Sequence, residues 1–139
     1  MKKVVLGNHT AVFAASSERD RIRRFYCDIL GAKTNIKSDD VDRIQLDESH
    51  FCFVYKDTAL DESEFLRATY LELKTDDTEG LKRRILSFGV KTLDVPDMHL
   101  YFQAPGGQVF RIVGIDEDLS HYERSQSALL GVNYQEQKA

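Results

Sequence analysis

The chain of 139 residues is 42% apolar and 30% charged, with a formal net charge of −4. This composition is ordinary for a soluble globular protein with a proper core. The basic residues are scattered, which argues against nucleic acid as a partner, and no apolar run approaches the ~20 residues of a membrane span.

Two further features indicate a cytoplasmic protein. The apolar run that follows Met1-Lys2-Lys3 is too short for a signal peptide. Cys27 and Cys52 have neither metal-finger nor redox spacing, so both are expected to be reduced thiols.

In the first half of the chain, residues 6–15 form a candidate strand whose alternation places Val12 and Ala14 on one face. Ser16 and Ser17 then offer N-caps for a helix over 18–30. Its apolar stripe is Ile22, Phe25, Tyr26, Ile29 and Leu30, and Gly31 ends it. Three short strands are predicted next, at 33–38, 42–47 and 51–55.

The second half predicts the same order of elements. Residues 57–64 are polar and acidic and are interpreted as a linker. A strand over 68–74, a helix over 77–88 and strands at 91–93, 100–103 and 108–115 follow. The stretch 116–139 is mostly polar, with an apolar cluster at Leu129, Leu130 and Val132.

The chain also contains an internal repeat. Gly31-Ala32-Lys33-Thr34 recurs as Gly89-Val90-Lys91-Thr92, and each copy follows a predicted amphipathic helix. A period near half the chain length indicates two copies of one supersecondary unit packed together.

Two motifs give this repeat a likeness to a known family. Phe25-Tyr26-Cys27-Asp28-Ile29-Leu30-Gly31 ends the first helix, and Pro105-Gly106-Gly107 precedes the last strand. With His9 opening the first strand, they resemble the vicinal-oxygen-chelate superfamily of glyoxalase I, fosfomycin-resistance enzymes, extradiol dioxygenases and bleomycin-resistance proteins.

The resemblance implies an α+β fold in which two tandem βαβββ modules form a curved mixed sheet around a cleft. We expect one domain over 1–118, with modules at 4–57 and 65–115, and a C-terminal extension over 119–139. The resemblance also implies a homodimer, to which the apolar cluster of the extension would contribute.

Metalloenzymes of this superfamily bind a divalent ion through ligands on the first and last strand of each module. Of the matching positions, only His9 carries a usual ligand. The second position falls at Ala68, or at Tyr70 if the register shifts by two residues, a third lies near Cys52, and the last falls at Arg111, a cation that repels metals. No metal cofactor is therefore expected, although a rearranged site of His9, His50 and Cys52 stays open as an alternative.

Arg111 directs attention to the predicted cleft. Its strand places it beside Val109 and Val113 on the cleft face, where an unpaired guanidinium would be costly. One interpretation is an internal ion pair with Glu72; the other is a clamp for a ligand carboxylate or phosphate. The remaining candidate ligand-binding residues are His9, Phe13, Cys52, Tyr70, His99, Tyr101 and Gln103.

The sequence leaves three functions open. The first is a metal-independent protein that binds a small anionic or aromatic organic molecule, as in the bleomycin-resistance branch. The second is an enzyme, of lyase, isomerase or dioxygenase type, with a rearranged metal site that includes His9 or with acid–base groups alone. The third is a protein that acts through its dimer surface.

Overall fold

The structure is a computed structural model that describes residues 6–66, 69–120 and 135–136. The chain divides into two compact units, Met1–Leu60 and Asp61–Ala139. The division falls inside the acidic stretch that was predicted to link the two copies. Among the described residues, no helix combines the length and apolar composition that crossing a membrane requires.

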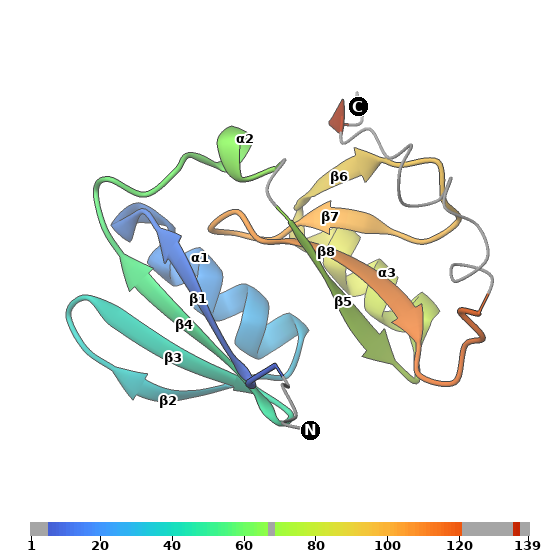
Figure 1. Cartoon of the computed structure of the whole chain (residues 1–139), viewed down its shortest axis with the longest axis horizontal. Helices are drawn as coiled ribbons and strands as arrows, with labels where there is room; N and C mark the ends of the chain where they lie inside the picture. Colours follow the sequence, from blue (N-terminus) through green and yellow to red (C-terminus); the bar gives the residue numbers. More distant parts are fainter. Residues whose placement is uncertain (1–5, 67–68, 121–134, 137–139) are drawn as a thin grey trace, which may run out of the picture. The chain divides into compact units, whose positions relative to one another are not determined.

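The first unit contains one four-stranded mixed sheet, called sheet 1, with a helical segment against it (Figure 1). The strand order is β1-β4-β3-β2, with β1 parallel to β4 and the other neighbours antiparallel. Its elements are β1 (His9–Ala14), η1 (Ser16–Glu18), α1 (Arg19–Arg23), η2 (Arg24–Ile29), β2 (Lys33–Lys37), β3 (Val41–Leu46) and β4 (Ser49–Tyr55). This is the predicted βαβββ order.

The helical segment of the first unit matches the predicted apolar stripe but not the predicted cap. Ile22, Phe25 and Tyr26 are fully buried, which explains why the sequence forms a helix here. No side chain caps its start, so the N-cap roles expected of Ser16 and Ser17 were wrong. Its last part, η2, widens into a π-helix before Gly31 adopts a positive φ of 76°.

The second unit repeats the first with additions at both ends. Its sheet, called sheet 2, has the order β5-β8-β7-β6-β9, with β5 parallel to β8 (Figure 1). Its elements are α2 (Glu62–Phe65), β5 (Tyr70–Thr75), α3 (Thr78–Phe88), β6 (Lys91–Asp94), β7 (Tyr101–Gln103), β8 (Val109–Gly114) and β9 (Gln135–Glu136). The predicted βαβββ order of the second copy is thus confirmed.

The additions correct two predictions. The stretch 57–64 is not linker throughout, because a capping box starts α2: the Asp61 carboxylate accepts a hydrogen bond from the Glu64 amide, and Glu64 accepts one from the Asp61 amide. The C-terminal extension contributes β9, which pairs with β6. The apolar cluster of Leu129, Leu130 and Val132 lies outside the described residues, so the homodimer stays a prediction.

The two sheets differ in how their faces are buried. In β1, Val12 and Ala14 are buried while Phe13 is 47% exposed, as the alternation predicted. In β8, by contrast, both faces are buried. The face that carries Arg111 bears an apolar cluster of Leu66, Leu93, Val95, Tyr101 and Val109, with Tyr70 packed against it.

Candidate functional site

Arg111 lies in the middle of β8, and its side chain is held by the neighbouring strand. Glu72 of β5 stands opposite Arg111 in the parallel ladder. The Glu72 Oε2 atom accepts hydrogen bonds from Arg111 Nε at 3.1 Å and Nη2 at 2.7 Å. The Arg111 side chain is 7% exposed and that of Glu72 28%. The internal ion pair, one of the two interpretations from sequence, is therefore present.

Tyr101 and Asp97 hold the other side of the guanidinium. Arg111 Nη1 donates to the Tyr101 hydroxyl at 3.2 Å, and that hydroxyl donates to Asp97 Oδ2 at 2.8 Å. Asp97 Oδ2 is also 3.6 Å from Arg111 Nη1. Burial alone lowers the pKa of Arg111, but the bonds to Glu72 and Tyr101 outweigh it, so the pKa is raised and the charge is permanent.

The charged network continues through His99. Its Nδ1 lies 2.9 Å from Asp97 Oδ1, and its Nε2 lies 2.5 Å from Glu117 Oε2. A neutral imidazole has only one N–H, so both contacts are hydrogen bonds only when the ring is an imidazolium. The Gly114 amide, and after it His99, lowers the pKa of Glu117. Glu72, Arg111, Tyr101, Asp97, His99 and Glu117 thus form one chain of contacts, called the Arg111 network.

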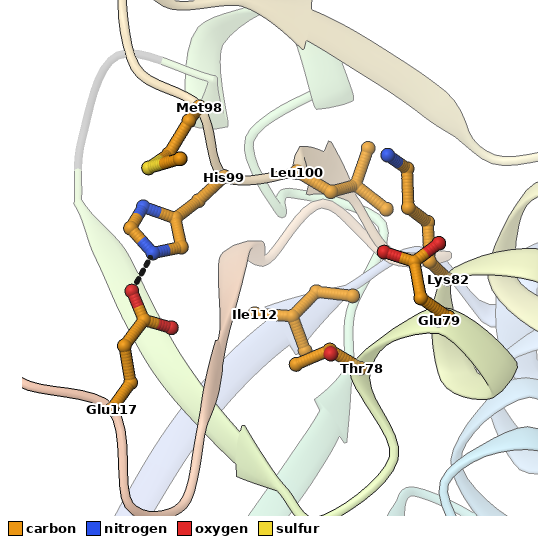
Figure 2. Close-up of a pocket in the computed structure, with 8 residues that line it drawn as sticks. All are labelled: Thr78, Glu79, Lys82, Met98, His99, Leu100, Ile112 and Glu117. Carbon is orange, nitrogen blue, oxygen red and sulfur yellow. Dashed lines mark hydrogen bonds and ion pairs between the residues drawn. The ribbon is translucent and has the colours of Figure 1, made fainter.

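The far end of this network borders a cavity. The cavity measures about 260 Å³, and Figure 2 shows His99 and Glu117 at one side of it. Met98, Leu100 and Ile112 form its apolar part, and Lys82 and Glu79 of α3 lie at the side opposite His99. Ile112 alternates with Arg111 along β8, so this cavity opens on the side of sheet 2 that α3 covers.

Tyr70 and Gln103 flank the Arg111 network. The Tyr70 ring meets the Tyr101 ring edge-on at 5.7 Å, and the Arg111 guanidinium lies 5.6 Å from its centre. Gln103 instead points toward α2, where its Nε2 donates to the carbonyls of Glu62 and Gly107 at 2.7 and 3.0 Å. Gln103 therefore fastens α2 to the sheet rather than joining the network.

The other three predicted residues belong to the first unit. The His9 ring stacks on the His50 ring, with centroids 4.7 Å apart and planes 12° from parallel. Cys52 is half-buried on the same face of sheet 1, and Phe13 is covered by Lys56 at 5.6 Å. The predicted site residues thus fall into both units, and those that the structure joins in one polar network are Glu72, His99, Tyr101 and Arg111 of the second unit.

This donor set does not fit the metal site of the superfamily. His9 pairs with His50 at the start of one parallel ladder and Tyr70 with Val109 at the start of the other, so Tyr70 is the counterpart of His9. Ala68 lies outside the described residues. A metal binds in the plane of an imidazole, and two nearly parallel stacked rings do not direct their lone pairs at one ion. Among the described residues, no group of three or more His, Cys, Asp or Glu side chains could hold a metal.

Sequence reasoning missed Asp97 and Glu117. Both lie outside strands, where hydrophobic periodicity gives no signal. For Asp97 a signal existed, because the alternation that places His99 and Tyr101 on one face extends back to residue 97. Glu117 follows a turn after β8, and nothing in the sequence pairs it with His99.

Comparison with known proteins shows the fold alone. No family model and no curated protein matches the chain. Among solved structures, a fosfomycin resistance protein, FosX, from Listeria monocytogenes is 12% identical with a TM-score of 0.67, covering 85% of this chain and 94% of that one. TnmS3, an antibiotic binding protein from Streptomyces sp. CB03234, is 15% identical with a TM-score of 0.61, at 82% and 98% coverage. A putative glyoxalase family protein from Bacillus anthracis is 13% identical with a TM-score of 0.64, at 82% and 98% coverage.

Proposed function

This chain has the fold of the vicinal-oxygen-chelate superfamily, and we propose that it binds a small organic molecule, aromatic or anionic, without a metal ion. The observation that carries the proposal is Arg111. It stands where the resemblance implies a metal-ligating glutamate, and its guanidinium is bonded to Glu72 and Tyr101. A permanent cation at that position disfavours a metal ion there, and its guanidinium can pair with an anionic group, as it does with Glu72.

Tyr70 and Glu72 give the binding surface its chemistry. Tyr70 is half-buried beside Arg111, so an aromatic ligand can stack against its ring. Glu72 lies on β5, at the edge of sheet 2, and its side chain is 28% exposed. An anionic group of the ligand would take the place of the Glu72 carboxylate at Arg111.

Two of the similar structures bear on this proposal. One is described as an antibiotic binding protein, and another as a fosfomycin resistance protein complexed with Mn(II) and a dihydroxypropylphosphonic acid. Binding of a small organic molecule is common to both descriptions. The donor set of this chain favours the metal-free form of such binding over the enzymatic alternative with His9.

The metal-free proposal predicts that the purified protein contains well below one equivalent of divalent metal. A metal site that keeps only one imidazole ligand has lost most of its coordination energy. When the protein is incubated with Mn²⁺, Ni²⁺ or Zn²⁺ and then dialysed, little metal should therefore stay bound. Elemental analysis by mass spectrometry measures this. About one equivalent retained by the native protein and lost in His9→Ala would contradict the proposal and favour the enzyme.

If an anionic ligand replaces the Glu72 carboxylate at Arg111, two substitutions should have opposite effects on the binding of an anionic aromatic probe. Glu72→Gln removes the competing carboxylate, so 2-naphthoate should bind several-fold more tightly. Arg111→Met removes the cation and should abolish the preference for 2-naphthoate over its neutral amide, 2-naphthamide. Isothermal titration of both probes measures these effects, with Lys74→Met as the control for an exposed cation on β5.

Unfolding must be monitored alongside, because a ligand that binds the native state raises its melting temperature. If 2-naphthoate binds Glu72→Gln no better than the native protein, Glu72 does not compete for Arg111. If neither probe binds any of the four proteins, the proposed surface on sheet 2 is wrong for aromatic anions.

A further inference from the structure

We infer that the cavity beside α3 is a separate binding site, for a small molecule that carries an anionic group on a compact apolar body. The inference does not depend on the surface proposed above. Arg111 and Ile112 are consecutive in β8, and only Ile112 lines the cavity. Arg111 and Ile112 therefore point to opposite faces of sheet 2, and the Arg111 network reaches the cavity at its far end, through His99 and Glu117.

The size and lining of the cavity set the size of the ligand. Its volume of about 260 Å³ lies just below the range of roughly 300–1,000 Å³ that is typical of ligand pockets. Leu100 and Ile112 supply an apolar surface, and Leu100 is only half-buried. A molecule of benzoate size would bury the exposed part of Leu100 and gain the corresponding hydrophobic free energy.

The charged groups at one side of the cavity are already paired. Each His99 ring nitrogen faces a carboxylate, and the second oxygen of Glu117 accepts a hydrogen bond from the Gly114 amide at 3.0 Å. These groups wall the cavity, but the contacts occupy both His99 nitrogens and both Glu117 oxygens. A ligand's charged group would therefore find its partner at the opposite side.

Lys82 provides that partner. It lies on the exposed side of α3, and within the described part of the chain its ammonium group makes no hydrogen bond or ion pair. Figure 2 shows it at the side of the cavity away from His99, with Leu100 beside it. An ammonium group next to an apolar surface matches a carboxylate attached to a small apolar ring.

Glu79 makes it possible to test whether the ligand is an anion or a cation. It is one helical turn before Lys82, lines the same cavity and likewise has no partner within the described part of the chain. Its carboxylate repels an anion and attracts a cation. Neutralising Glu79 and neutralising Lys82 must therefore change the affinity for a charged ligand in opposite directions. If the ligand is an anion, the loss of Glu79 strengthens binding and the loss of Lys82 weakens it; for a cation the effects are reversed.

The experiment is a titration of the full chain with benzoate, benzamide and benzylamine, followed by amide chemical shifts in two-dimensional NMR. Benzoate should shift the resonances of residues 98–100 and 112 and bind more tightly than the other two probes. Lys82→Gln should weaken benzoate binding about three- to tenfold, and Glu79→Gln should strengthen it about two- to threefold. Arg83→Gln, an exposed cation on the next position of α3, should leave it unchanged.

All three substituted residues are exposed, so the variants should fold, and matching melting temperatures check this. Equal affinity for benzoate and benzamide, or no response to Lys82→Gln, would overturn the inference. So would tighter binding of benzylamine that Glu79→Gln abolishes, because it would make the cavity a cation site. Shifts confined to the Tyr70 and Glu72 resonances would assign benzoate to the surface of the proposed function instead.

Discussion

Replacing Arg111 with alanine is expected to lower the free energy of unfolding by about 3 kcal/mol. The substitution removes the shared partner of Glu72, Tyr101 and Asp97 and leaves a void in a position that is 6% exposed. The Asp97 side chain is as buried as that of Arg111, at 7% exposure, so its carboxylate loses a counter-charge that water does not fully replace. Urea unfolding monitored by circular dichroism measures the change.

A second pair of variants separates charge from packing. Arg111→Met keeps most of the side-chain volume and removes the charge, so its loss of stability reports the electrostatic part. Glu72→Gln should cost about 1 kcal/mol in the native background, since Glu72 is partly exposed, and almost nothing beside Arg111→Met. Additive losses in the double variant would mean that the two side chains do not interact in solution.

Lys74→Met is the matched control for these substitutions. Lys74 follows Glu72 by two residues on the same face of β5, but it is exposed and makes no ion pair with a described residue. Its replacement should change the free energy of unfolding by less than about 0.5 kcal/mol. A loss as large as that of Arg111→Met would show that any cation on this face stabilises the fold.

The elements that the sequence predicted well are those with a long periodic signal. The alternation of Val12, Phe13 and Ala14 and the stripe through Ile22, Phe25 and Tyr26 determine which face is buried, and the structure follows both. The helix α2 is four residues long, too short for a period of 3.6 to be detected. Its capping box, Asp61 with Glu64, was readable, but the acidic composition favoured a linker.

In the candidate site, too, contacts between residues on regular strands could be predicted, and contacts made by irregular segments were missed. Arg111 and Glu72 could be paired from sequence because both occupy regular strands whose order followed from the resemblance. Asp97 was not placed with them, although the alternation through His99 and Tyr101 extends back to it, because it lies in an irregular segment after Pro96 where alternation is a weaker guide to side-chain direction. Contacts made by such segments depend on tertiary structure, and sequence patterning says little about them.

A second buried network, in the first unit, was also missed. Asp42 is fully buried in β3 on the same face as Ile44, and its carboxylate accepts hydrogen bonds from Arg19, Arg23 and Tyr55. The signals were present: Arg19 and Arg23 are four residues apart on one helix face. They were not connected with Asp42 from the sequence, because burial of an acidic residue becomes plausible only once its partners are known.

The largest expected effect of pH concerns this carboxylate. Burial alone raises the pKa of Asp42, but the hydrogen bonds from Arg23, Arg19 and Tyr55 together outweigh it and lower the pKa to about 2. Since the pKa is below that of the unfolded chain, about 3.9, Asp42 stabilises the folded state above pH 4 and loses that contribution as the pH falls toward 2. The shift corresponds to about 2–3 kcal/mol.

Asp42→Asn should therefore lower the free energy of unfolding by about 3 kcal/mol at pH 7, because Arg23 has no other hydrogen-bond partner among the described residues. The difference between the native protein and Asp42→Asn should then shrink as the pH falls from 4 to 2, since the native carboxylate becomes protonated there. Urea unfolding at pH 7, 4, 3 and 2.5 measures this difference directly.

Asp40→Asn is the control, because Asp40 is exposed two residues earlier. Within the described part of the chain, its backbone carbonyl accepts a hydrogen bond from the Tyr55 amide and its side chain makes none. Its effect should be below about 0.5 kcal/mol at every pH. Subtracting the stability of Asp42→Asn from that of the native protein cancels the titration of the carboxylates that both share, so what remains belongs to Asp42. A difference between the native protein and Asp42→Asn that stays constant from pH 7 to pH 2.5 would mean that the Arg19 and Arg23 bonds do not depress the pKa of Asp42, and that its role is only to fill space between α1 and β3.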